Sequence, residues 1–344
     1  MNNQEDTVDR SMLHWHPGTM HDSRGVVLVL VLAVVSLFTV MVVNFSADQS
    51  LDIEFAYHFR DSLQAEYLAR AGVEAAVALL AQDDPTYDAQ DEDWASFSEY
   101  LLAASAYLEG LSFSGTLTDE SSKIDINSIV KADGTRDEFR IQELKRLFYI
   151  LEIDITQPEL ADLMDALVDW LDPDAETAFG AENPYYESLE SPYVCKDGPM
   201  DSIEEILLVR GMKPGYFYGT DDREGIKAFI TVDTKGMINL NTASDEVIFS
   251  IVPEGFNPDD VLNTILEFRP ITPENLQSCM EAIGFSASAD LAEVKWIKDK
   301  VLSIASARFS ARIRGIMPSG AMVNIHAVLD RSKGKPEIVY YRIY

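Results

Sequence analysis

The sequence predicts an α+β fold with a long N-terminal helix, a largely helical middle and a C-terminal antiparallel sheet. Three observations predict it. An uncharged apolar run at 26–43 continues into an amphipathic stripe, a strand-plus-helix unit occurs twice in the middle, and three β-rich runs end the chain. Because helix and sheet must each bury an apolar face, we expect the sheet to pack on the amphipathic half of the helix.

Composition favours a folded chain and limits the classes of partner that it can bind. The 344 residues are 47% hydrophobic and 10% aromatic, enough for two or three domains with a sizeable core. The formal net charge is −31, from 58 acidic and 27 basic residues. Such a polyanion repels phosphate backbones and attracts divalent cations and basic partners, which disfavours nucleic-acid binding. The two cysteines, Cys195 and Cys279, are too few to indicate a disulfide framework.

The N-terminal helix is predicted by two consecutive patterns. The uncharged run 26–43 would be about 27 Å long as a helix, close to the thickness of a bilayer core. Apolar residues then recur every fourth position, which continues the helix with one apolar stripe until Asp83, Asp84 and Pro85 end it. The sequence therefore predicts one helix over 26–83, and its stripe consists of Leu51, Phe55, Phe59, Leu63 and Tyr67.

The residues before the apolar run admit two interpretations. A polar leader ends in Arg24 and Gly25, and no small-residue cleavage step follows the run, which disfavours an ordinary secretory signal. The layout resembles a type IV prepilin signal, which is cut before the apolar segment. From these residues alone, Gly25 is equally well a flexible hinge before a membrane anchor.

The middle and the end of the chain contain recognisable elements. Strands at 123–129 and 236–243 are each followed by helices, which indicates one unit used twice. Hydroxyl-to-acid spacing predicts helix caps at Thr135, Thr156 and Thr242. Alternation and intervening turns predict three antiparallel strands near 308–316, 321–330 and 337–343.

Five segments carry a family resemblance. "LVDWLDPD", "GAENPYY", "SIEEILLVRGM", "INLNTA" and the final strands occur in an order that resembles the type II secretion system protein K family of minor pseudopilins, which are type IV pilin-like proteins. The resemblance covers nearly all of 24–344. It implies a pilin-like fold, in which a long N-terminal transmembrane and amphipathic helix packs on a C-terminal antiparallel sheet, with a large inserted α-helical domain.

The resemblance also implies a domain organisation. The expected parts are a cleaved prepilin leader at 1–25, the long helix at 26–83 with its transmembrane part at 26–43, a pilin-like connecting region at 84–119, the inserted helical domain at 120–225, and a second strand-helix repeat with the C-terminal sheet at 226–344.

Maturation is expected at the start of the apolar run. The resemblance implies cleavage by a prepilin peptidase between Gly25 and Val26, followed by N-methylation of Val26. Leu30 would then be the fifth mature residue, where most pilins and pseudopilins carry a glutamate that pairs with the amino terminus of the neighbouring subunit. A carboxylate inside the membrane is costly without such a partner, so a subunit with leucine suits the filament tip. The plainer interpretation is that Leu30 is one more apolar membrane residue.

By resemblance, the protein caps the tip of a periplasmic pseudopilus and helps to initiate its assembly for export of folded proteins across the outer membrane. The expected partners are the I and J type minor pseudopilins, the major pseudopilin, the prepilin peptidase and the inner-membrane secretion platform, with no nucleic acid. The expected location is the inner membrane, crossed once, with the C-terminal part in the periplasm.

An acidic segment suggests a calcium site. Five carboxylates lie within 169–187, where Pro173 and Gly180 bend the backbone. Oxygen ligands on a loop suit calcium, although the spacing is not that of an EF-hand and a solvated acidic loop is the ordinary alternative. Because members of the resembled family bind calcium in this domain, we expect a structural calcium ion. The candidate ligands are Asp169, Asp172, Asp174, Glu182 and Glu187.

The sequence offers two alternative functions. The stretch 238–269 resembles a helix-hairpin-helix DNA-binding module, but its hairpin "PEGFNPDD" carries one glycine and three acids, a poor surface for phosphate. A membrane-anchored enzyme is the other alternative. His58 and His326 have no cysteine, serine or aspartate partners in a catalytic pattern, so we expect no enzymatic activity.

Overall fold

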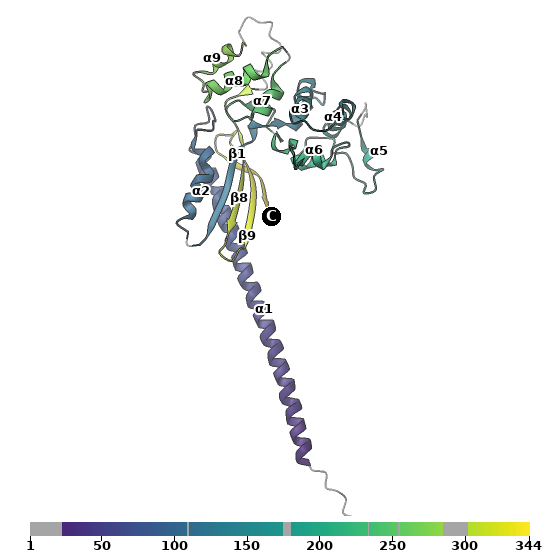
Figure 1. Cartoon of the computed structure of the whole chain (residues 1–344), viewed down its shortest axis with the longest axis vertical. Helices are drawn as coiled ribbons and strands as arrows, with labels where there is room; N and C mark the ends of the chain where they lie inside the picture. Colours follow the sequence, from purple (N-terminus) through teal and green to yellow (C-terminus); the bar gives the residue numbers. More distant parts are fainter. Residues whose placement is uncertain (1–22, 109, 175–179, 233, 254, 285–301) are drawn as a thin grey trace, which may run out of the picture. The chain divides into compact units, whose positions relative to one another are not determined.

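The computed structural model describes residues 23–344 except 109, 175–179, 233, 254 and 285–301 (Figure 1). The expected leader at 1–25 therefore lies largely outside the described residues. The chain divides into two compact units, Met1–Arg60 and Asp61–Tyr344. The α-helices are α1 Ser23–Leu80, α2 Phe97–Ser105, α3 Glu138–Ile150, α4 Gln157–Leu171, α5 Asn183–Tyr186, α6 Pro214–Tyr218, α7 Asp245–Ile251, α8 Pro258–Phe268 and α9 Leu276–Ala282.

The strands fall into one large sheet and several short pairs. The large sheet contains β1 Ser112–Asp119, β8 Arg308–Ile316, β9 Met322–Asp330 and β10 Glu337–Ile343. The short strands are β2 Ile124–Asp125, β3 Gly219–Thr220, β4 Arg223–Glu224, β5 Ile230–Thr231, β6 Ile238–Asn239 and β7 Leu302–Ser303.

Helix α1 runs without interruption for 58 residues. Its apolar N-terminal part has a mean hydropathy of 3.2 over its best window, none of it buried, and is long enough to cross a membrane. Further along, the helix buries a face of small residues at intervals of three and four, made by Ala65, Ala69, Val73 and Ala76. The predicted stripe is not the packed face, because Leu51, Phe55, Phe59, Leu63 and Tyr67 are all exposed. Small side chains form the contact because they let the sheet approach closely.

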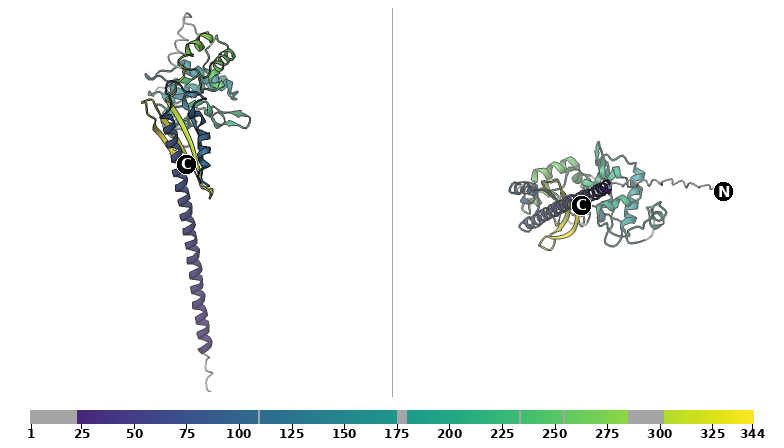
Figure 2. Two further views of the ribbon diagram at one scale, coloured as in Figure 1. Left: turned by 90° about the vertical axis from the view of Figure 1, so that its left-hand side faces the viewer. Right: turned by 90° about the horizontal axis from the view of Figure 1, so that it is seen from below.

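The large sheet packs on the buried face of α1, as expected. Its strands are antiparallel in the order β1-β8-β9-β10, and β1, β8 and β9 lie side by side next to α1 (Figures 1 and 2). Alternate residues of β8 and β9 enter a shared core with α1, among them Phe309, Ile313 and Leu329. Gly315 makes the closest approach, since a Cβ there would lie 2.2 Å from the Ala65 carbonyl oxygen.

The three predicted C-terminal strands are present almost to the residue. The fourth strand, β1, pairs along its whole length with β8 and lies in the region 84–119, where no strand was expected. Its sequence, "SFSGTLTD", alternates weakly because only Leu117 and Asp119 are buried. The sheet is therefore one strand larger than the sequence indicated.

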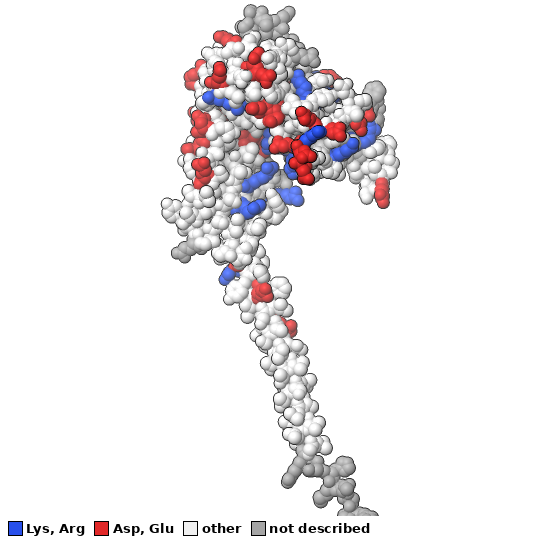
Figure 3. Space-filling view, in the orientation of Figure 1, with Lys and Arg blue, Asp and Glu red and all other residues white. Residues whose placement is uncertain are grey.

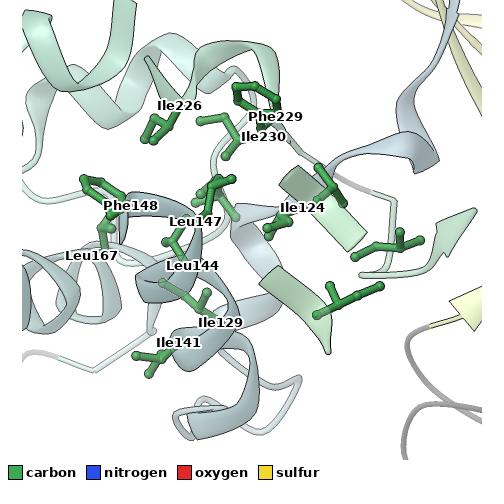
Figure 4. Close-up of a cluster of buried hydrophobic side chains, with 14 of the residues drawn as sticks. Ile124, Ile129, Ile141, Leu144, Leu147, Phe148, Leu167, Ile226, Phe229 and Ile230 are labelled. Atoms are coloured by element: carbon green, nitrogen blue, oxygen red, sulfur yellow. The ribbon is translucent and has the colours of Figure 1, made fainter. Parts of the chain in front are cut away.

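The helical middle has its own core. Ile124, Ile141, Leu144, Leu147 and Phe148 are fully buried there, and Figure 4 shows this cluster between α3 and its neighbours. Isoleucine and leucine on the inner faces of α3 and α4 make this part a separate apolar cluster from the helix–sheet core.

The two strands predicted at 123–129 and 236–243 are much shorter than expected. The first is reduced to β2, parallel to β5, and the second to β6, parallel to β7. After β2, the Asp125 carboxylate accepts a hydrogen bond from the Asn127 amide at 2.9 Å, which starts a 3₁₀ turn in place of further strand.

One of the three predicted helix caps is confirmed. Thr156 and Glu159 form a reciprocal capping box at the start of α4. The other two predictions are wrong by two residues, because Asp137 caps α3 and Ser244 caps α7. The Thr242 hydroxyl instead donates to the Asp119 carboxylate at 2.6 Å.

Candidate functional site

The acidic segment folds around the end of α4 and the start of α5. Asp169 lies in the last turn of α4, Asp172 is its C-terminal cap, and Glu182 is the N-terminal cap of α5. One carboxylate oxygen from each of Asp172, Asp174 and Glu182 lies within 4.8 Å of the others. This separation suits oxygen ligands around one divalent cation.

A second group extends the cluster beyond the predicted segment. Glu182 also lies within 4.8 Å of Asp197 and of the Cys195 sulfur. Cys195 is a buried free thiol, and so is Cys279. Glu182 is therefore the residue that both groups share.

The cluster is short of hydrogen-bond donors. Glu182 is only 3% exposed, and neither of its carboxylate oxygens has a hydrogen-bond partner among the described residues. Asp169 Oδ2, Asp172 Oδ1 and Asp197 Oδ1 are buried and equally unsatisfied within the described part of the chain. Buried carboxylate oxygens without donors are costly, so the geometry favours a bound cation.

Burial and repulsion between neighbouring carboxylates raise the pKa values of Glu182 and Asp172. Burial, followed by the charges of Asp197 and Asp169, raises the pKa of Glu182 to about 7. Burial and the neighbouring Asp174 raise the pKa of Asp172 to about 6. Burial raises the pKa of the Cys195 thiol to about 12. A divalent cation would offset the repulsion and favour the ionised carboxylates.

The predicted ligands separate into three roles. Asp172, Asp174 and Glu182 are brought together as predicted. Asp169 lies against the backbone bend at Gly180. A Cβ at position 180 would lie 2.3 Å from Asp169 Oδ2, so this close contact explains why the residue there is glycine. Glu187 is exposed and belongs to neither group.

Sequence reasoning missed Asp197. It follows the acidic segment by ten residues, in "CKDGPM", and nothing in that spacing marks it as part of the cluster. Its backbone has a positive φ of 51°, a conformation that aspartate tolerates better than most residues. The chain turn there returns it to the end of α4.

The predicted processing site lies near the start of the chain, far from the acidic cluster in sequence. Gly25 and Val26 are in the first turn of α1, and an added Cβ at Gly25 would meet no atom within 4 Å. Val26 and Leu30 are exposed by 65% and 62%. An apolar face of this size is stable only in a membrane or against partner helices.

Comparison with known proteins finds relatives of one family. A family model described as type II secretion system (T2SS), protein K matches residues 122–218, which contain the acidic cluster. A type II secretion system protein K from Aeromonas hydrophila is 24% identical over 305 residues, covering 84% of this chain and 87% of the relative. In sequence, the chain is similar to members of the type II secretion system protein K family.

Two further comparisons agree with this family. A type II secretion system protein K from Klebsiella pneumoniae is 25% identical over 198 residues, covering 56% of this chain and 59% of the relative. A chain in the crystal structure of the GspK-GspI-GspJ complex from enterotoxigenic Escherichia coli matches with a TM-score of 0.62 at 19% identity, covering 83% of this chain and 97% of that one. The structural likeness confirms the pilin-like fold.

Proposed function

We propose that this chain is a protein K type minor pseudopilin that caps the tip of a periplasmic pseudopilus and helps to initiate its assembly, for export of folded proteins across the outer membrane. The family match is the observation that carries the proposal. The single apolar helix would anchor the chain in the inner membrane, with the sheet and helical parts in the periplasm. The role is structural, without enzymatic activity.

The exposed stripe on α1 supports assembly through helix contacts. Phe55, Phe59 and Tyr67 are exposed by 69%, 72% and 64%, outside the face that the sheet covers. Apolar side chains at intervals of four fit the groove of another helix. Because the crystal structure that shares this fold is a complex of GspK, GspI and GspJ, we propose that the I and J type minor pseudopilins occupy this stripe first. The major pseudopilin, the prepilin peptidase and the inner-membrane platform would act in later or earlier steps.

Copurification tests this assembly. The full chain is coexpressed with the I and J type subunits of its own organism, and the complex is isolated through a tag on this chain. We expect a stable three-subunit complex that Phe55→Asp with Phe59→Asp abolishes. Tyr107→Asp is the matched control, because Tyr107 is 89% exposed but lies outside α1. Failure of the native chain to retain either subunit would contradict the proposal.

We further propose that calcium binds the acidic cluster as a structural ion. Asp172, Asp174, Glu182 and Asp197 would supply the oxygen ligands, and the ion would neutralise the repulsion that raises the pKa values of Asp172 and Glu182. The unpartnered, buried oxygens of Glu182 support this most directly. The cation would fix the end of α4 against the start of α5.

Calcium binding is tested on chelator-treated protein. We expect calcium to raise the unfolding temperature of the native chain, and expect Asp172→Asn with Glu182→Gln to remove this response. Glu187→Gln is the control, because Glu187 is exposed and outside the cluster. An unfolding temperature that calcium leaves unchanged would show that the site holds no calcium.

A further inference from the structure

The C-terminal segment that forms most of the large sheet has a net positive charge, opposite in sign to that of the whole chain. Residues 308–344 hold seven lysines and arginines but only two acids, whereas the whole chain has a formal net charge of −31. Figure 3 shows basic side chains over the sheet and many acidic ones over the helical part. A positive surface on so acidic a protein marks a place where an acidic partner can approach.

Strand register places two arginines in one row, on either side of a half-buried histidine, whose pKa burial lowers. Arg312 of β8 faces His326 of β9, and His326 faces Arg342 of β10. Facing residues lie on the same side of a sheet, with neighbouring strands about 4.8 Å apart. The adjacent residues Ala311 and Ala327 are buried against α1, so the row lies on the opposite, outward face. Arg312 and Arg342 are exposed and form no ion pair with a described residue.

The outer edge of β10 is unpaired within the described residues, because β10 is the last strand in the sheet order. Tyr344 and Asn324 exchange two backbone hydrogen bonds of 3.0 Å. By the alternation of antiparallel pairs, Arg342 also points its backbone groups toward β9, while Tyr341 and Ile343 point theirs away from the sheet. An exposed row of unpaired amides and carbonyls is a template for another strand.

Side chains along this edge differ between the two faces. Tyr341 and Ile343 are directed to the α1 side of the sheet and remain 39% and 41% exposed. Arg342 lies on the outward face, next to the row that begins at Arg312. A strand added here would therefore meet apolar groups on one face and guanidinium groups on the other.

We propose that the edge of β10 binds an extended segment of a partner protein in which acidic and apolar residues alternate. The backbone would pair with Tyr341 and Ile343, the carboxylates would meet Arg342, and the apolar side chains would cover the α1 side. A guanidinium group binds a carboxylate through two parallel hydrogen bonds in one plane. The contact is therefore directional as well as electrostatic. This surface is separate from α1 and does not depend on the proposed filament contacts.

Two features define the register and exclude self-pairing. A register shift between Ile338 and Tyr340 interrupts β10, so the regular edge runs from Tyr340 to the C-terminus. A second copy of β10 would bring its own Arg342 and hairpin lysines against the same positive row, and like charges across strands are destabilising. The occupant is therefore an acidic strand of another protein.

The test uses the full chain in detergent and fluorescent ten-residue peptides of alternating Asp and Val. We expect the Asp-Val peptide to bind and its Lys-Val analogue not to bind. Ile343→Pro removes an outward amide and should weaken binding roughly tenfold, whereas Ile343→Ala keeps the amide and should weaken it by roughly threefold or less. Arg342→Gln should weaken binding of the Asp-Val peptide, and Lys333→Gln, in the hairpin, is the matched charge control.

Hydrogen exchange on the native chain keeps the test decisive if Ile343→Pro does not fold. We expect the Asp-Val peptide to slow exchange at the Tyr341 and Ile343 amides specifically. The proposal is overturned if these amides gain no protection, or if the Lys-Val peptide binds equally well. It is also overturned if vesicles of phosphatidylglycerol displace the peptide and bind in its place, or if the edge pairs two copies of this chain.

Discussion

Asn239 Nδ2 donates to Asp119 Oδ2 at 3.0 Å and joins two parts of the chain that lie 120 residues apart. Asp119 ends β1 of the large sheet, and Asn239 ends β6 of the second strand-helix repeat. The same amide group donates to the Asp88 carbonyl oxygen and to Ser306 Oγ. Both Asn239 and Asp119 are buried, so this contact fixes the helical repeat to the sheet through polar groups with little access to water.

Asn239→Ala should destabilise the fold severely. The substitution leaves the Asp119 carboxylate and the Asp88 carbonyl short of donors in a buried place, which costs about 3 kcal/mol in the free energy of unfolding. Urea unfolding of the native and variant chains measures this difference. Asn324→Ala, on the half-buried outward face of β9, is the control and should change the free energy by less than about 1 kcal/mol. An equal effect of both changes would contradict the structural role of Asn239.

Stability should depend on pH through Asp88. Burial raises the pKa of Asp88 to about 7 in the folded chain, even though Arg331 pairs with it. The folded state therefore binds a proton that the unfolded state releases between about pH 4 and 7, so stability falls as pH rises through this window. The slope from one group is at most about 1.4 kcal/mol per pH unit.

The comparison of native chain and Asp88→Asn isolates this contribution. Raised carboxyl groups remote from Asp88, such as Glu182, contribute equally to both proteins and cancel in the difference. We expect urea midpoints of the native chain to fall more steeply between pH 4 and 7 than those of the variant. Parallel pH profiles would show that Asp88 does not titrate in this range.

Gly315→Ala should weaken the packing of the sheet on α1. The new Cβ would lie 2.2 Å from the Ala65 carbonyl oxygen, so helix and strand must separate. Overpacking of this kind costs about 1–3 kcal/mol. Gly198→Ala is the control, because its Cβ would meet only the Lys196 carbonyl at 3.9 Å. Differential scanning calorimetry should show a lower unfolding temperature for Gly315→Ala alone.

Leu30→Glu should impair the proposed tip function. A tip subunit has no neighbour above it to supply an amino terminus, so the new carboxylate would lie in the membrane unpaired, at a cost of about 3 kcal/mol. We expect less assembled pseudopilus and less secretion of folded proteins into the medium, with normal processing by mass spectrometry as the control. Undiminished secretion would mean that position 30 does not distinguish a tip subunit.

The fold was predictable where local pattern and tertiary packing agree. The strands β8 and β9 alternate because one face meets α1, whereas β10 stays largely exposed, and the predicted limits of all three hold. Strand β1 was not predictable, since its polar sequence becomes a strand only by pairing with β8. The helix itself was predicted, but its buried face was not. Alanines at 65, 69 and 76 carry a weak hydrophobic signal beside Phe55 and Phe59, although they make the closer contact.

The candidate metal site was predictable only in part. Asp172, Asp174 and Glu182 are close in sequence and are brought together by one bend at Gly180. Asp197 joins them through a chain turn that leaves no local pattern, and the exposed direction of Glu187 follows from its place after the one-turn helix α5. Sequence proximity therefore identifies the cluster, while its membership depends on tertiary structure.

The central claim is tested most directly by the mature amino terminus. The full chain is expressed with its prepilin peptidase, extracted from the membrane and analysed by intact-mass and terminal-peptide mass spectrometry. The account predicts a chain that begins at Val26 and carries one methyl group on its amino nitrogen. An intact leader ahead of Gly25, or cleavage after residue 43, would contradict it.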